Sequence, residues 1–155
     1  MTRALRQTLA DWLLALGAPL LLLSLFLTWS HQFSPAFLAR FGHSSVLQGV
    51  PRDPTAWQVY SDTDVMLALI AGGMLAIALW GGHARRLALA LAVAVAIAFT
   101  VHAIAVPPTN GAVVFDPGTG AWARNGASSG AGEWLALVAL AIGAAGIGFS
   151  FSAER

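Results

Sequence analysis

The stretch "VMLALIAGGMLAIALWGGHARRLALALAVAVAIAFTVHAIAV", residues 65–106, decides the fold. It contains two long apolar runs separated by the short link "GGHARR", residues 81–86. A helix needs about 20 apolar residues to cross a bilayer, within a range of about 17–25, whereas a membrane strand alternates apolar and polar residues over about 10 positions. These runs are apolar on all sides, so we predict two antiparallel membrane helices joined by a tight turn.

Two further apolar windows, Trp12–Trp29 and Trp134–Phe151, flank this pair. Hydrophobic residues make up 57% of the chain and charged residues only 10%, against about 25% charged residues in soluble domains. We predict a single transmembrane domain over residues 1–155, with spans at about 12–29, 64–82, 87–106 and 134–151. The expected fold class is an all-α membrane protein, a four-transmembrane-helix bundle with a small extracytoplasmic cap made of a short helix plus a β-hairpin or strands.

The first window also resembles the apolar core of a signal peptide, because Arg3 and Arg6 precede it. Its apolar region exceeds the usual length of about 7–15 residues, and no clear cleavage site follows it. We therefore expect an uncleaved span.

Arginine placement predicts the orientation, because basic residues concentrate in short cytoplasmic loops. Arg85 and Arg86 lie in the short link between two spans, whereas Arg40 and Arg124 lie well inside long loops. Both termini are therefore expected in the cytoplasm, with outer loops at residues 30–61 and 107–132. All basic residues are arginine and alanine and glycine are abundant, which is typical of a GC-rich bacterial genome, so we expect a bacterial plasma membrane.

Tryptophans at the span ends suggest an interfacial belt, with Trp12 and Trp80 at the inner boundary and Trp29 and Trp134 at the outer one. Small residues at four-residue spacing predict faces where helices pack closely within the chain. These faces are Ala68–Gly72–Ala76, Ala88–Ala92–Ala96, Ala139–Gly143 and Ala144–Gly148.

The two outer loops carry local structural signals. In "FSPAFLARFG", Ser34 is the expected N-cap of a short helix, Pro35 its first residue and Gly42 its end. "SSVLQGV" and "AWQVY" are expected as short strands, and residues 112–115 and 121–124 as a hairpin around "DPGTG". "NGASSGAG", residues 125–132, is expected to be a flexible tether.

The entry to the second span, "DPTAWQVYSDTDVML", residues 53–67, is both acidic and aromatic. We interpret Ser61 as the helix N-cap and Asp64 as its capping partner, with Trp57 and Tyr60 at headgroup height. Asp53, beside Arg52, is the acid that the helix start does not explain, so it is the first candidate for a partner contact. The full set of candidate contact residues is Asp53, Arg52, Trp57, Tyr60, Trp122 and His102.

Little in the sequence points to catalysis. Cysteine is absent, which excludes disulfides, thiolate metal sites and cysteine nucleophiles. The histidines are scattered without ligand spacing, and no phosphate loop or nucleophile elbow is present. His102, inside the third span, is interpreted as structural, with a haem, proton or ligand role left open. Asp11, three residues after Thr8, is interpreted as a helix-start acid. No metal and no cofactor are expected, although the outer loops are acidic enough to leave cation binding open.

"LFLTWS", residues 25–30, followed by Trp57, Tyr60, Ser61 and Asp64 in a Trp-x-x-aromatic-Ser-x-x-Asp pattern, resembles a group of small four-span membrane proteins common in actinobacteria. The resemblance covers about the first half of the chain and implies the four-span layout, and no catalytic residues carry over from it. The layout is also similar to that of claudin-type tetraspan proteins, but the claudin cysteines and Trp-Gly-Leu-Trp pattern are missing.

We therefore expect a non-enzymatic multi-pass membrane protein that acts by protein–protein contact, as an accessory subunit of a membrane complex or a self-associating scaffold. Its expected partners are the lipid bilayer and other membrane protein subunits or further copies of itself. A formal net charge of +1 offers no field for nucleic acid. The alternatives are an oligomeric channel or small-solute transporter and a redox or ligand-binding membrane protein that depends on His102.

Overall fold

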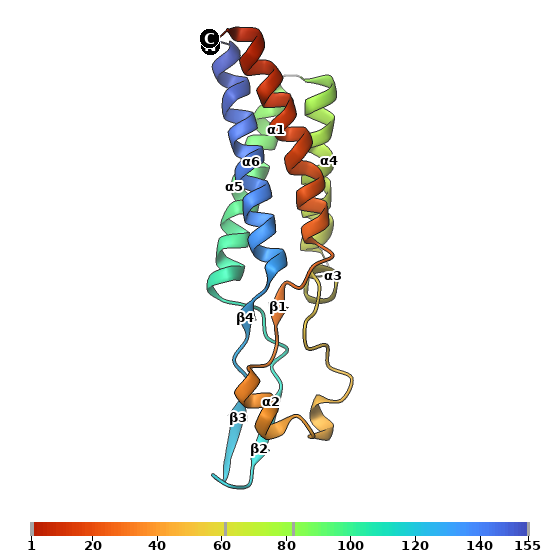
Figure 1. The fold of residues 1–155 in the computed structure, drawn as a ribbon, viewed down its shortest axis with the longest axis vertical. Helices are drawn as coiled ribbons and strands as arrows, with labels where there is room; N and C mark the ends of the chain where they lie inside the picture. The colour runs from red at the N-terminus through yellow and green to blue at the C-terminus, as the bar shows by residue number, and fades with distance from the viewer. Residues whose placement is uncertain (1, 61, 82, 155) are drawn as a thin grey trace.

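The structure is a computed structural model that describes residues 2–60, 62–81 and 83–154. Four long helices form a bundle and the other elements form a cap at one end of it (Figure 1). The bundle helices are α1 (Arg3–Ser24), α4 (Thr63–Trp80), α5 (His83–Ala105) and α6 (Ala131–Glu154). Each is long and apolar enough to cross a membrane. The prediction of a mostly helical chain with four helices of membrane-spanning length is therefore confirmed, and the chain has the make-up of a multi-pass membrane protein.

Helices α1 and α6 make the most extensive contact in the bundle, because glycines leave room where they pack. A Cβ on Gly17 would lie 3.0 Å from the carbonyl oxygen of Ala139 and 2.6 Å from the terminal methyl of Met74 in α4. A Cβ on Gly146 would lie 3.0 Å from the carbonyl oxygen of Ala10. These separations are shorter than ordinary van der Waals contact, so glycine at these positions permits the close approach of the two backbones.

The predicted small-residue faces are only partly right: Ala96 of α5 is buried, and Ala68 of α4 and Ala144 of α6 pack partly buried against the core. Ala139 and Gly143 of α6 are buried, but Gly72 of α4 and Gly148 of α6 are exposed, with nothing within 4 Å of an added Cβ. Ala88 of α5 is exposed as well. In a chain this rich in alanine the spacing recurs on every face, so the larger side chains decide which face turns inward. The buried face of α4 consists of Asp64, Leu67, Ala71, Met74 and Ile77.

The belt prediction is wrong for one tryptophan. Trp12, Trp80 and Trp134 are 70%, 74% and 54% exposed, as residues facing lipid or headgroups would be. Trp29, in contrast, is 0% exposed. Because α1 ends at Ser24, Trp29 lies beyond the helix, and the chain folds its indole ring back into the bundle.

The cap begins with a short antiparallel pairing between β1 (Ser30–His31) and β4 (Ser128–Ser129), which joins the exit of α1 to the entry of α6. Two backbone hydrogen bonds fasten the same exit to the segment before α4, from Trp29 N–H to the Pro54 carbonyl at 2.9 Å and from Gln32 N–H to the Arg52 carbonyl at 2.8 Å. The remaining cap elements are α2 (Pro35–Phe41), the 3-10 helix η1 (Ser45–Leu47), α3 (Ala56–Val59), β2 (Val113–Asp116) and β3 (Ala121–Arg124).

The cap has a small core of its own, made by Phe33, Phe37 and Val114 with partly buried neighbours. It fixes α2 against the β2–β3 hairpin, which is the part of the fold farthest from the bundle (Figure 1). The hairpin register pairs Phe115 with Trp122, and "DPGTG" makes the turn, with Gly120 at a φ of 66° that glycine adopts readily.

The local predictions for the cap meet mixed outcomes. The α2 prediction is confirmed, with Ser34 accepting the Phe37 N–H and Gly42 at the C-cap. The hairpin is also confirmed. Both predicted strands in the first loop are wrong, because residues 45–47 form η1 and residues 56–59 form α3, whose start is closed by a capping box between Thr55 and Gln58. The capping box satisfies the backbone locally, and that outweighs the β-propensity of the segment.

The predicted flexible tether is wrong as well. Residues 128–129 form β4, and the N–H groups of Gly130 and Gly132 donate to the carbonyls of Trp29 and Thr28 at 2.8 and 2.7 Å. The glycines serve close backbone approach here, not flexibility. Asp11 does not lie at a helix start either, since α1 begins at Arg3, and its carboxylate instead accepts the Gln7 amide at 2.9 Å.

Candidate functional site at the junction of bundle and cap

Three aromatic rings meet where the cap joins the bundle, and we call them the aromatic plug: Trp29, Tyr60 and Phe99. The Tyr60 ring meets Trp29 edge-on at 5.8 Å and Phe99 edge-on at 5.1 Å between centroids. Trp29 lies 6.5 Å from Phe99. The indole Nε1–H donates to the Ser24 carbonyl at 2.8 Å, so the last turn of α1 holds the ring in place.

The first turn of α6 packs directly on the plug. A Cβ on Gly132 would lie 2.7 Å from the indole nitrogen of Trp29 and 2.8 Å from the Ser24 carbonyl oxygen. Only a glycine lets the helix start so close to the ring. The next residue, Glu133, is thereby carried into the end of the bundle.

Two carboxylates are buried at this junction. Asp64, in the first turn of α4, and Glu133, in the first turn of α6, are both 0% exposed. No side chain of the described residues hydrogen-bonds to either carboxylate, and the backbone of Gly130 is the group placed to act on Glu133 as a hydrogen-bond donor. Both sit at helix N-termini, where the helix dipole favours negative charge, but the loss of hydration without a replacement donor opposes ionisation at a buried site.

Tyr60 links the two carboxylates. Burial of the phenol, the charge of Glu133 and the charge of Asp64, in that order, raise the pKa of Tyr60 to about 12. The charges of both acids therefore act on the same phenol from two different helices. We call Tyr60, Asp64 and Glu133 the acid–tyrosine cluster.

The prediction that Asp64 caps the start of α4 is therefore wrong. The N-cap is Asp62, whose side chain makes no capping hydrogen bond, and Asp64 points inward. The expected N-cap residue, Ser61, lies outside the described residues. Asp64 belongs to the same buried face as Leu67 and Ala71. Its position on that face of the helix places its carboxylate inside the bundle, and this position cannot be read from an acid in the first turn alone.

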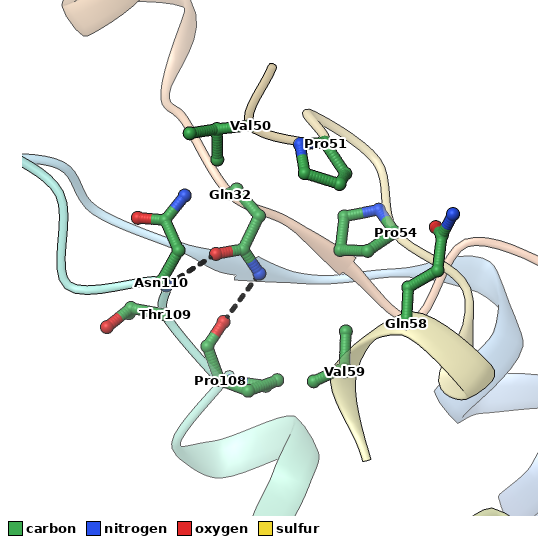
Figure 2. Close-up of a pocket in the computed structure, with 9 residues that line it drawn as sticks. All are labelled: Gln32, Val50, Pro51, Pro54, Gln58, Val59, Pro108, Thr109 and Asn110. Carbon is green, nitrogen blue, oxygen red and sulfur yellow. Dashed lines mark hydrogen bonds between the residues drawn. The ribbon is translucent and has the colours of Figure 1, made fainter. Parts of the chain in front are cut away.

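A cavity of about 180 Å³ opens beside the junction, among Gln32, Pro51, Pro54, Val59 and Pro108 (Figure 2). The Gln32 amide is the polar group at its centre, and it is already occupied. Its Nε2–H donates to the Pro108 carbonyl at 2.8 Å, and its Oε1 accepts the Asn110 N–H at 2.7 Å (Figure 2). Gln32 therefore ties β1 to the segment that follows α5, and the cavity is a by-product of this structural link.

A second, wider cleft contains Asp53 and Arg52, both predicted contact residues. The Asp53 carboxylate pairs with the His31 imidazole Nδ1 at 2.6 Å, with the side chains 59% and 50% exposed. Asp53, which has no role in the helix start, thus has a partner within the chain, His31. Such an exposed pair contributes about 0–1 kcal/mol. The contact role of Asp53 and Arg52 stays a prediction.

The other predicted residues lie apart. Trp57 is 42% exposed and its ring lies 6.0 Å from that of Phe26. Trp122 is 68% exposed on the hairpin. His102 faces outward from α5, away from the bundle interior where a haem or ligand would be enclosed. Within residues 2–60, 62–81 and 83–154, no three His, Asp or Glu side chains gather as metal ligands.

Comparisons with protein-family models, with curated proteins and with solved structures returned no match.

Of the predicted contact residues, only Tyr60 lies in the acid–tyrosine cluster. Glu133 was missed as a site residue. Its signal was available in the sequence, because "GEWLALVALAIG" places an acid directly before an apolar run, and an acid at that position lies either in the headgroups or inside the bundle.

Proposed function

We propose that this chain is a non-enzymatic protein of a bacterial plasma membrane that acts by protein–protein contact, as an accessory subunit or a self-associating scaffold. Both termini lie in the cytoplasm in this proposal, and the cap projects outward as the contact surface. The arginine distribution supports this orientation.

The observation that carries the proposal is the aromatic pair at the tip of the cap. Phe115 and Trp122 face each other across the hairpin at 5.4 Å and are 47% and 68% exposed. This hairpin lies at the far end from the bundle (Figure 1), so lipid does not account for its exposed aromatic rings. Exposed aromatic clusters of this kind mark contact sites, and tryptophan is among the residues that contribute most to binding.

The aromatic pair is also held firmly. Asp116, between the pair and the turn, accepts the Gly118 N–H and the Thr119 hydroxyl, each at 3.0 Å, and its other contact is an ion pair with Arg40 of α2 at 2.6 Å. A rigid aromatic surface loses little conformational entropy on binding. The cap is thus a preorganised platform.

The test is co-purification from native membranes after crosslinking. In the Phe115→Ala/Trp122→Ala double variant we expect at least about a tenfold loss of the crosslinked species, equivalent to about 1.4 kcal/mol. Trp12→Ala is the matched control, because Trp12 is 70% exposed near the middle of α1, far from the hairpin, and it should retain the species. A wild-type protein that stays a monomer and crosslinks to nothing would refute the proposal.

The buried acids favour a second candidate, an oligomeric channel or small-solute transporter. Ionisable residues inside membrane-spanning helices often mark transport pathways, and Asp64 and Glu133 lie in two such helices. Proton or cation flux into liposomes, abolished by Asp64→Asn, would support transport. The absence of flux for every ion tested would count against it.

A further inference from the structure

The acid–tyrosine cluster presents two carboxylates that the contact function does not use. Asp64 and Glu133 are 0% exposed, and no side chain of the described residues hydrogen-bonds to either of them. Burial of an ionised carboxylate without hydrogen bonds or a counter-ion is strongly unfavourable. A positive charge bound to these carboxylates would therefore stabilise the junction, and no described side chain next to them provides it.

Among the residues that the structure describes, neither carboxylate belongs to an ion pair. At this junction α1 contributes Ser24 and then Trp29, and α5 contributes Thr100, whose hydroxyl donates to the Ala96 carbonyl at 2.8 Å. Toward the cap, Asp62, His102 and Arg124 are exposed, and His31 pairs with Asp53. Arg85 and Arg86 lie in the first turn of α5, and α5 begins at the end of the bundle opposite the cap (Figure 1).

We propose that Asp64 and Glu133 form a cation-binding site whose ligand is the hydrogen ion, one on each carboxyl group. A proton needs no coordination shell, and the set of three or more acidic or histidine ligands that a metal would require is missing from the described residues. Tyr60 is half-buried at the end of α3, just before α4 begins.

Proton release has a structural consequence at the plug. Ionisation of Glu133 places a bare charge one residue from Gly132, which packs on the Trp29 ring. Hydration of that charge requires water to enter between the α6 start and the ring. The junction is therefore closed while both acids are protonated and loosens when they ionise.

Infrared spectroscopy of the purified full-length protein in detergent tests the assignment directly. At neutral pH, ordinary Asp and Glu, with pKa values of about 3.9 and 4.3, are ionised, so the carbonyl stretch of a protonated carboxylic acid would come from this pair. We expect that band in the wild type, with its intensity reduced by roughly half in Asp64→Asn and in Glu133→Gln and lost in the double variant. Asp62→Asn, which changes an exposed acid two residues away, should leave the band intact.

Two results would overturn the proposal. One is a wild-type spectrum without the band at neutral pH, a result that needs no variant to fold. The other is loss of the band on addition of Na⁺ or Ca²⁺ at constant pH, which would assign the pair to a metal ion. This readout does not depend on any partner, so failure of the contact proposal leaves it unaffected.

Discussion

Gly132→Ala is the sharpest test of the junction, because it changes one methyl group at the contact between α6 and Trp29. The added Cβ would lie 2.7 Å from the indole nitrogen and 2.8 Å from the Ser24 carbonyl oxygen. The Cδ1 atom of the ring would lie closer still, and ordinary contact begins at about 3.5 Å, so either the ring or the first turn of α6 must move by about 1 Å.

Both movements are costly. Displacing the ring breaks the buried hydrogen bond from Trp29 to the Ser24 carbonyl, which costs about 1–3 kcal/mol when the donor is left unsatisfied. The overpacking itself adds about 1–3 kcal/mol, and the helix preference of alanine returns about 0.5–1 kcal/mol. We expect the free energy of unfolding to fall by about 1–5 kcal/mol.

The matched control lies in the same helix. Gly148→Ala adds the same methyl at an exposed position with nothing within 4 Å, so its effect should be neutral or stabilising by up to about 1 kcal/mol. The assay is unfolding of both variants in detergent, followed by tryptophan fluorescence and circular dichroism. Equal stabilities for the two variants would refute the packing of α6 on Trp29.

Three further predictions test other parts of the fold. Tyr60 is the single tyrosine of the chain, so ultraviolet titration should show its ionisation near pH 12. In Glu133→Gln the midpoint should move toward the ordinary value of about 10. An unchanged midpoint in that variant would show that the charge of Glu133 does not act on Tyr60. Met74→Ala should cost about 2–5 kcal/mol, because Met74 is 0% exposed, whereas Met66→Ala, at 54% exposed, should cost far less; similar losses in thermal unfolding would contradict the packing. Burial alone would raise the pKa of Asp116, but the hydrogen bonds to its carboxylate and its arginine partner outweigh burial and hold the pKa below its ordinary value of 3.8. Its stabilising contribution is therefore present above pH 3.8 and is lost as the pH falls through the lower pKa of the folded state. Limited proteolysis should find the hairpin protected down to that pH range in the wild type, and cleaved at higher pH in Asp116→Asn.

The membrane helices could be predicted from the sequence because length and apolarity act over many residues at once. The hairpin and α2 were also predictable, since turn and capping residues act within a few positions. What the sequence could not supply was the position of single residues relative to distant ones. Trp29 looks like any interfacial tryptophan until the end of α1 is known, and the small-residue spacing of α4 does not reveal that Gly72 faces outward.

The candidate site was the least predictable part for the same reason. Asp64 and Glu133 lie in helices separated by a third span, and each resembles a helix-start acid when read locally. Their common burial depends on the way the four helices pack together. Tyr60 was selected as an aromatic at headgroup height, whereas its position in the structure is set by contacts with Trp29 and Phe99.

The short pairing of β1 with β4 has a mechanical consequence. It locks the exit of α1 to the entry of α6, and at the other end of the same two helices the Arg6 guanidinium donates to the Ser152 carbonyl at 3.0 Å. The pair is therefore clamped at both ends and behaves as a single strut, whereas α4 and α5 are tied to the cap through hydrogen bonds between Trp29 or Gln32 and the segments that precede α4 and follow α5. A load applied at the hairpin tip passes through β3 and β4 into this strut, and reaches the opposite end of the bundle as a tilt or rotation of α1 and α6 together.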